Sequence, residues 1–179
     1  STEISLTIEQ EGTFADKTFL LHTALLVAEP EKRILVTMID LTERKIAEQE
    51  LKKSEEKYRR LIENAPVGIT LVNNRGEIED TNNAALLIFG LETKEQLIGT
   101  RAMDYYFNPD ERTDFLKRLN NGVVRNYEIR MKHRDGSIVW VMETSVKQVH
   151  PDGRESHLSI MEDITQRKRT ENALRDSEV

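Results

Sequence analysis

The sequence predicts an α+β domain, a five-stranded antiparallel sheet with short helices on one face, preceded by a long helix and a three-stranded partial sheet. One observation is the order of elements: two strand-like runs, then short helical runs, then three strand-like runs, at 67–72, 77–81, 123–132, 137–149 and 156–163. The other is a repeat, since segment 161–168 has a near copy at 38–45. Each copy lies between a strand-like run and a charged, helix-like run, which indicates shared architecture.

Residues 1–41 are predicted to form the last three strands of a truncated domain. The strand-like runs are 3–10, 18–28 and 33–40, and the first of them alternates apolar with polar side chains. Three strands with one apolar face bury too little surface to be stable alone. We therefore expect the front half of this domain to lie outside the chain.

Turn and cap residues divide the complete domain, predicted at 65–165, into its elements. Residues 73–76 have the composition of a hairpin turn, and Asp-Gly at 135–136 between two alternating runs is a strong hairpin signal. A short helix is predicted at 82–89. Asn108 followed by Pro109 predicts the start of another helix, which the Asn caps.

Residues 42–64 are predicted to form a long linker helix, and 166–179 the start of a second one. A heptad-like seam runs along the first helix and comprises Ala47, Leu51, Ser54, Tyr58 and Leu61. Such a seam predicts a parallel two-chain coiled coil, and hence a homodimer. The alternative is an amphipathic helix that lies on its own domain.

The repeated segments are predicted to be joints at which a sheet ends and a helix begins. Their central residues are Asp40, Leu41, Thr42, Asp163, Ile164 and Thr165. Each Asp stands three residues before an acid or an amide, Glu43 or Gln166, which is the spacing of a capping box, although either Thr could cap instead. An ordinary helix cap explains one copy, whereas two copies with matching flanks favour a shared mechanical role in signal relay.

The chain resembles the PAS domain with its C-terminal PAC segment over about residues 55–168. The likeness rests on several pieces in the right order: the entry at 54–66, the first hairpin at 67–76, the first helix at 82–85, the middle helices at 97–99 and 109–112, the central hairpin at 135–141 and the exit motif at 163–165. Residues 1–42 resemble the end of a preceding PAS domain. The five-stranded PAS sheet and the partial PAS sheet are expectations that follow from this resemblance.

The resemblance implies sensing and relay inside a signalling protein, often a histidine kinase or a diguanylate cyclase. The module itself is expected to be cytoplasmic, either in a cytoplasmic protein or as part of a membrane-anchored one. A pocket between sheet and helices would hold a small-molecule ligand, and the exit motif would pass the change through a signalling helix to an effector domain downstream in the same chain. The candidate pocket residues are Leu71, Leu86, Phe89, Met103, Tyr105, Phe107, Phe115, Tyr127, Ile129, Met131, Trp140, Met142, Thr144 and Ile160. The alternative is that these side chains only fill a core. Trp140, Met142 and Thr144 share one face of a strand, which alternation does not identify as inner or outer.

Composition disfavours two of the family's cofactors. The chain has no Cys, which the covalent flavin branch requires. Its four His residues, 22, 133, 150 and 157, fall in predicted strands or turns rather than in the middle helices, where the haem branch has its axial ligand. The cofactor is thus unknown, non-covalent flavin remains open, and no metal site is predicted.

Charge and motifs disfavour other functions. The net charge of −6 argues against a nucleic-acid partner. No apolar run approaches the ~20 residues of a membrane helix, so no membrane contact is expected. No kinase or cyclase motif occurs, so catalysis within this chain is not expected. A sensor and relay module is the first hypothesis, a ligand-free dimerisation spacer the second, and an enzyme fragment the third.

Overall fold

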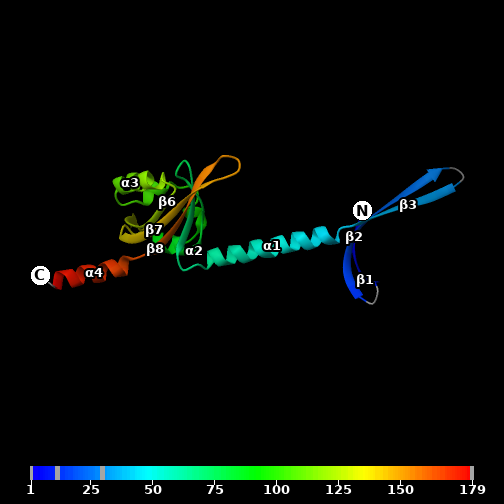
Figure 1. Ribbon diagram of the computed structural model, residues 1–179, viewed down its shortest axis with the longest axis horizontal. Coiled ribbons are helices and arrows are strands. Elements are labelled where there is room, and N and C mark those ends of the chain that lie inside the picture. Colours follow the sequence, from blue (N-terminus) through cyan, green and yellow to red (C-terminus); the bar gives the residue numbers. More distant parts are fainter. Residues whose placement is uncertain (1, 11–12, 29–30, 178–179) are drawn as a thin grey trace. The chain divides into compact units, whose positions relative to one another are not determined.

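The computed structural model describes residues 2–10, 13–28 and 31–177 and divides the chain into two units, Ser1–Arg59 and Arg60–Val179 (Figure 1). The first unit contains a sheet with the order β1-β2-β3. Its strands are β1 (Thr2–Gln10), β2 (Thr13–Ala28) and β3 (Glu31–Asp40), all antiparallel. The predicted partial sheet is therefore confirmed.

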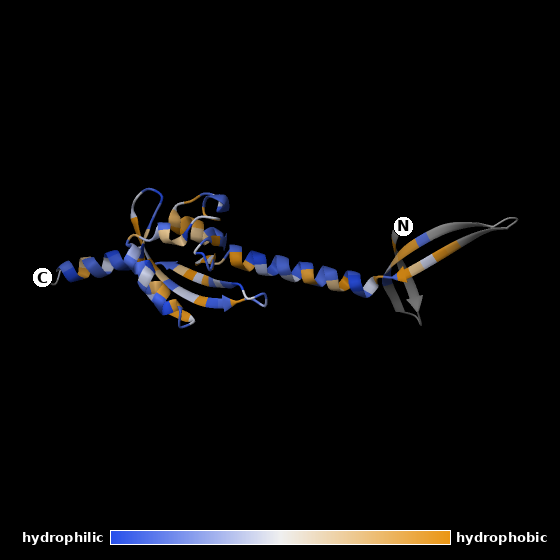
Figure 2. Ribbon diagram, turned by 90° about the horizontal axis from the view of Figure 1, so that it is seen from above, coloured by the Kyte–Doolittle hydropathy of each residue, from blue (hydrophilic) through white to orange (hydrophobic). Residues whose placement is uncertain are grey.

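The two outer strands of this sheet pair with different halves of β2. The β1 register runs from Thr2 opposite Leu21 to Gln10 opposite Thr13. The β3 register runs from Phe19 opposite Asp40 to Ala28 opposite Glu31. Apolar side chains near the end of β3 are 46–59% exposed and belong to Leu35, Val36, Met38 and Ile39. The apolar colouring of this strand is visible in Figure 2. Within the described part of the unit, these side chains have no covering layer.

Helix α1 (Thr42–Glu63) is a single helix of 22 residues with no buried side chain. It combines many charged residues with the apolar positions that the seam requires. All five predicted seam residues are exposed, Leu51, Tyr58 and Leu61 by about three-fifths of their surface. The helix therefore receives little stabilisation from burial within this chain.

The second unit contains a five-stranded antiparallel sheet in the order β5-β4-β8-β7-β6, and this confirms the predicted fold class. Its strands are β4 (Gly68–Asn73), β5 (Ile78–Thr81), β6 (Val123–Lys132), β7 (Ile138–Val149) and β8 (Glu155–Asp163). Between β5 and β6 come α2 (Asn83–Phe89), the 3-10 helices η1 (Lys94–Gln96) and η2 (Ala102–Tyr105), and α3 (Pro109–Leu119). Helix α4 (Thr165–Ser177) follows β8.

Caps fix the helices over the sheet. Asn108 accepts a hydrogen bond from the Asp110 N–H at 3.0 Å, and Pro109 occupies the first turn of α3, as predicted. Gly90 ends α2 in the left-handed conformation, with φ of 69°. A Cβ at this position would lie 2.1 Å from the His133 ring, so both backbone and space require glycine.

One sheet face is packed against the helices, and the other face is less deeply buried. The core combines side chains of α2 with the inner face of β4, β6, β7 and β8. In β7 the buried positions are Val139, Val141, Glu143 and Ser145, whereas the alternate positions are half-buried. Because neighbouring side chains point to opposite faces, a glutamate and a serine lie inside together with the valines.

Candidate functional site

A polar cluster lies inside the second unit between α3 and the sheet. The Tyr106 hydroxyl donates to Glu143 Oε2 at 3.3 Å and accepts from an Arg112 guanidinium nitrogen at 3.3 Å. All three residues are buried, with Tyr106 1%, Glu143 2% and Arg112 6% exposed. A buried tyrosine hydroxyl needs a partner, and here it joins a carboxyl group to a guanidinium.

Serine hydroxyls complete the surroundings of the buried carboxyl. Ser145 Oγ donates to Glu143 Oε1 at 2.9 Å and lies 2.6 Å from Ser159 Oγ. Burial raises the pKa of the Glu143 carboxyl, against the opposing effect of these hydroxyls and of Arg112. Burial and the nearby Glu143 charge together raise the pKa of the Tyr106 hydroxyl well above its usual value. The cluster thus places a carboxyl group of raised pKa close to a permanently charged guanidinium.

His157 on β8 is the unsatisfied member of this region. It is 6% exposed, and its Nε2 atom is buried without a hydrogen-bond partner. Burial, and after it the Arg112 charge, lowers the pKa of the imidazole to about 4. His157 is therefore neutral near pH 7. A buried polar atom without a partner is rare and calls for an explanation.

Two cavities meet at this cluster. The inner one, between sheet and helices, has a volume of about 20 Å³, which is water-sized. The outer one is a groove of about 390 Å³, bordered by η2, α3, the β4–β5 turn and the neighbouring parts of β7 and β8. Arg112 and His157 line both cavities. The space for a small molecule therefore lies in the groove, with the polar cluster beneath it.

The structure separates the predicted pocket residues into three sets. Phe89 and Met131 line the inner cavity, and Met103 lines the groove. Five others belong to the core or pack against it, namely Leu86, Tyr105, Phe115, Tyr127 and Ile129. The remaining six lie away from both cavities: Leu71, Phe107, Trp140, Met142, Thr144 and Ile160.

The placement of these six corrects the prediction, and strand alternation explains most of it. In β4 the inner positions are Thr70 and Val72, which leaves Leu71 on the other face. The same one-residue offset places Trp140, Met142 and Thr144 on the outer face of β7. Ile160 is likewise 39% exposed on β8, and Phe107 is 45% exposed beside Arg130, with the guanidinium 5.2 Å from its ring centre.

Sequence reasoning missed the polar residues of the site, Arg112, Glu143, Ser145, His157 and Ser159. It assumed an apolar pocket, whereas the inner face of β7 becomes polar after Val141. The available signal was periodicity, because Glu143 and Ser145 stand in phase with Val139 and Val141. Tyr106, by contrast, stands out in the sequence as one of two adjacent tyrosines, and a buried tyrosine hydroxyl needs a partner.

The joint at the end of the second sheet is a clasp between β8, β7 and α4. Ile164 N–H donates to Trp140 O at 2.8 Å, and Trp140 N–H donates to Thr165 Oγ1 at 3.0 Å. Thr165 N–H donates to Asp163 Oδ1 at 2.8 Å. These bonds join the end of β8, the start of β7 and the first residue of α4. Residues 163–165 take part in all of them.

The joint of the first unit repeats these bonds. Leu41 N–H donates to Thr18 O at 2.8 Å, and Thr18 N–H donates to Thr42 Oγ1 at 3.0 Å. Thr42 N–H donates to Asp40 Oδ1 at 2.9 Å. The two Asp-x-Thr segments therefore lie in equivalent backbone surroundings.

The clasp differs from the predicted capping box. Each Asp accepts from the N–H two residues on, in an Asx-turn, and each Thr oxygen bonds back to a strand rather than to its own helix. A capping box also needs a hydrogen bond from the Glu43 or Gln166 side chain to the Asp backbone N–H, and the described hydrogen bonds include none. The Thr hydroxyl is engaged across the sheet, so the motif ties strands together as well as starting a helix.

Charged side chains hold the first turn of α4 against the sheet. Glu128 on β6 pairs with Arg167 at 2.8 Å and with Lys168 at 2.5 Å. The Lys168 ammonium lies 5.5 Å from the centre of a Trp140 ring. Ile164 is 3% exposed and anchors the turn in the core.

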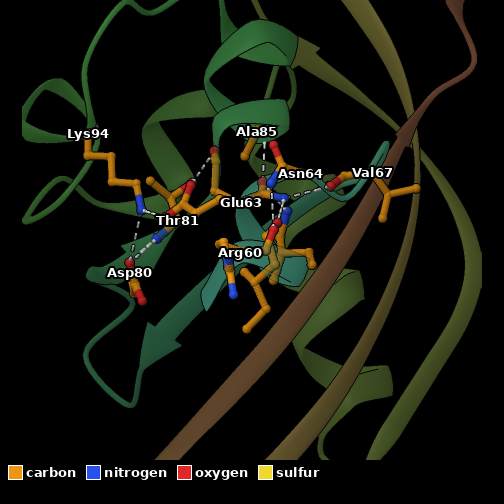
Figure 3. A network of polar contacts seen from close by, with 11 residues as sticks. Arg60, Glu63, Asn64, Val67, Asp80, Thr81, Ala85 and Lys94 are labelled. Carbon is orange, nitrogen blue, oxygen red and sulfur yellow. Dashed lines mark hydrogen bonds and ion pairs between the residues drawn. The ribbon is translucent and has the colours of Figure 1, made fainter. Parts of the chain in front are cut away.

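The opposite end of the domain is fastened through Asn82, which is fully buried. Its Oδ1 accepts from the N–H groups of Ile69 at 2.9 Å and Ala85 at 3.0 Å. Its Nδ2 donates to the carbonyls of Ile62 and Val67, both at 2.9 Å. Figure 3 shows this network, which bonds the last turn of α1 to β4 and α2. All four hydrogen-bonding positions of the amide are used.

An ion pair supports the same end of α1. Lys94 on η1 pairs with Glu63, the last residue of α1, and lies 3.9 Å from an Asp80 carboxylate oxygen on β5 (Figure 3). The 179-residue chain thus has one helix bonded to the start of the domain and another to its end.

This combination of fold and joints defines a single-sheet α+β domain between two helices. The PAS domain model matches residues 66–166, more than half of the chain, and the chain belongs to the PAS domain family. It is 25% identical to the PAS domain of a protein from Colwellia psychrerythraea, with a TM-score of 0.55, over 62% of this chain and 97% of that one.

Curated relatives are larger signalling proteins. "Sporulation kinase E" of Bacillus subtilis is 31% identical over 144 residues, which are 79% of this chain and 19% of the relative. "Probable diguanylate cyclase DgcE" of Escherichia coli is 29% identical over 126 residues, 68% of this chain and 11% of the relative. The chain thus spans less than a fifth of the length of either protein. The similarity supports a sensor module of signal transduction and identifies only the PAS domain within this chain.

Two features are absent from the part of the chain that the structure describes. None of the described helices is long and apolar enough to span a membrane. No described group of His, Asp or Glu side chains is arranged to hold a metal ion.

Proposed function

We propose that the chain is a sensor and relay module of a multidomain signalling protein. A change at the polar cluster would pass along β7 and β8 to the second clasp and so to α4. The register supports this route, because Glu143 is paired with Met161 and Val141 with Asp163. Glu143 is therefore two residues from Val141 on β7, and Val141 is paired with Asp163, the clasp residue of β8.

The family and the relatives support the setting of this module. We propose a cytoplasmic protein in which a histidine kinase or a diguanylate cyclase domain follows in the same polypeptide. Helix α1 would deliver a second input, because Asn82 bonds its last turn to the same core. The relay would act as a population shift between two arrangements of the helices.

The relay is tested by fusing the chain in register to the kinase core of a histidine-kinase relative. We expect Asp163→Ala to change autophosphorylation severalfold, since it removes the hydrogen bond at the first residue of α4. Asp152→Ala is the matched control, because Asp152 Oδ1 accepts the same kind of bond from Arg154 N–H at 3.0 Å in a hairpin turn outside the clasp. Equal output from both variants and the parent fusion would end the relay proposal.

We also propose that α1 pairs with α1 of a second copy. The predicted seam is exposed along its whole length, which leaves it open to a partner helix. Sedimentation should show a dimer that Leu51→Glu with Leu61→Glu dissociates. Lys53→Glu, off the seam on the same helix, should leave the dimer intact, and a monomeric parent chain would refute pairing.

A ligand-free dimerisation spacer is the second candidate. It is favoured by the water-sized inner cavity, which leaves no room for a ligand within the core. A spacer predicts that seam variants alter fusion output whereas substitutions in the groove and the polar cluster do not. A severalfold response to Tyr106→Phe in a folded dimer would favour the sensor instead.

A further inference from the structure

The groove above the polar cluster contains a buried cation with too few partners. Arg112 is 6% exposed, yet among the described hydrogen bonds its guanidinium makes one, at 3.3 Å to the Tyr106 hydroxyl. No carboxylate lies within ion-pair distance among the described residues. A guanidinium carries five N–H donors in a planar fork, so most of its donor capacity is available.

Other cations on the groove walls already have acids beside them. Arg75 pairs with Glu77 at 3.1 Å, and Lys147 pairs with Glu155 at 2.9 Å. Arg101 also lies near the Glu77 carboxylate, whose pKa its charge helps to lower. Arg112 is thus a cation of the groove without an ion-pair partner among the described residues, and the nearest groups to its guanidinium include the rings of Tyr106 and Phe115, with centres 5.3 Å and 5.2 Å away.

A second, independent observation lies next to it. His157 is buried, lines the same groove, and has an Nε2 atom without a hydrogen-bond partner. A ligand with an acceptor at Arg112 would place polar atoms close to this imidazole. Two unsatisfied polar groups on two different elements, α3 and β8, therefore border one cavity.

The walls restrict the rest of the ligand. Met103, Leu116 and Leu119 give the α3 side an apolar surface, and Asn73, Asn74 and Ser156 give the opposite side neutral polar groups. A volume of about 390 Å³ fits a small metabolite. One free guanidinium matches one planar anionic group in a bidentate manner.

We propose that this groove binds a small organic monocarboxylate, with its carboxylate on Arg112, its second polar contact at His157 Nε2 and its apolar body against α3. The bound carboxylate would draw the Arg112 guanidinium away from Tyr106 and change the environment of Glu143 on β7. The inference deepens the sensor role proposed above and rests on it for the consequence of binding.

Binding is tested on the full chain by ¹H–¹⁵N NMR titration with butyrate and benzoate. The probes are used at about 20 mM, enough to fill a site with a dissociation constant of about 1 mM. We expect saturable shifts at the backbone amides of Arg112, Ser156 and His157. The neutral isosteres butyramide and benzamide should bind at least about tenfold more weakly than the carboxylates, because they lack the charge-assisted bonds.

Two variants locate the site. Arg112→Met should weaken binding about tenfold or more, whereas Lys117→Met, an exposed cation on the same helix, should not. Because a buried arginine also supports the fold, Leu116→Trp provides a second route: it fills the groove from an exposed position and should abolish the shifts in a folded protein.

Several outcomes would overturn the proposal. One is the absence of saturable shifts with either carboxylate, and another is binding of the amides as tight as that of the carboxylates. The others are binding that survives both Arg112→Met and Leu116→Trp, and tighter binding of inorganic phosphate than of both carboxylates. The fusion experiment with Asp163→Ala uses no ligand. Loss of the carboxylate site would therefore leave the relay proposal standing, and failure of the relay would leave the binding result valid.

Discussion

The two clasps have the same backbone bonds but different support. In both, an Asp oxygen receives the Thr N–H, and the Thr oxygen receives an N–H from the start of the preceding strand. The central residue differs, since Ile164 is buried and Leu41 is half-buried. The second clasp also has Glu128 and Trp140 beside its helix. The local sequence thus makes the clasp, and the complete domain adds packing and charged contacts to it.

The largest expected difference comes from the central residue. Ile164→Ala should lower the free energy of unfolding of the second unit by about 2–4 kcal/mol, because it leaves a cavity in a packed core. Urea unfolding followed by fluorescence of Trp140, the one tryptophan of the chain, reports on this unit. Leu41→Ala should leave the same transition unchanged, and a comparable loss from both variants would contradict the distinction.

Acid should weaken the core behind the second clasp. The folded-state pKa of His157 is about 4, below its ordinary value of 6.5, so the unfolded chain takes up a proton first as the pH falls. The stability linked to His157 is present above about pH 6.5 and is lost as the pH decreases toward 4. Between pH 7 and pH 5 the loss is about 2 kcal/mol.

The raised pKa of Glu143 acts in the opposite direction, since its stability is present below the unfolded pKa and is lost as the pH rises through the folded one. Comparing the parent with His157→Gln therefore isolates the histidine. The variant should lack the acid-induced loss in urea unfolding at pH 5. An unchanged pH dependence in the variant would show that His157 is not the titrating group.

The Asp residues should contribute similarly at both clasps. Asp163→Ala and Asp40→Ala each remove one bond to the first N–H of a helix. Amide exchange in the first turn of α4 and α1 should accelerate about fivefold in the respective variants. A large effect at one helix and none at the other would indicate that the motif acts through its surroundings alone.

The smallest effect is expected from the ion pairs. Glu128→Gln removes one partner of Arg167 and Lys168 near the surface, and both cations keep Glu171 as a partner. Such pairs contribute little, so exchange in the first turn of α4 should increase about twofold and Trp140 unfolding should change little. High salt should produce the same change in the parent protein, and an effect as large as that of Ile164→Ala would be inconsistent with this view.

The sequence was informative where patterns are local. The repeat identified both clasps, and turn residues such as Asp135 and Asn108 placed the strands and helices in order. Which face of each strand points inward was harder to predict, because β7 carries apolar side chains on both faces from Ile138 to Met142. Alternation then separates Trp140 from Val141 without showing which one is inside.

Periodicity places Glu143 and Ser145 in phase with the buried valines of β7, but it does not show that Arg112 lies in the same interior. Arg112 lies in a charged helix start, and Glu143 lies in a strand whose polar residues, apart from Ser145, are half-buried or exposed. Their burial depends on Tyr106, which approaches from a different element and joins them. The joining of these residues is a tertiary property that no single stretch of sequence shows.

Hydrogen exchange in Thr165→Val tests the central claim, that the clasp couples the sheet to the helix, most directly. The substitution removes the acceptor of Trp140 N–H and leaves the α4 bond from Lys168 N–H to Ile164 O in place. Coupling predicts that both amides lose about tenfold or more of their protection, whereas Thr42→Val changes neither. Loss of protection at Trp140 with full protection at Lys168 would contradict the account.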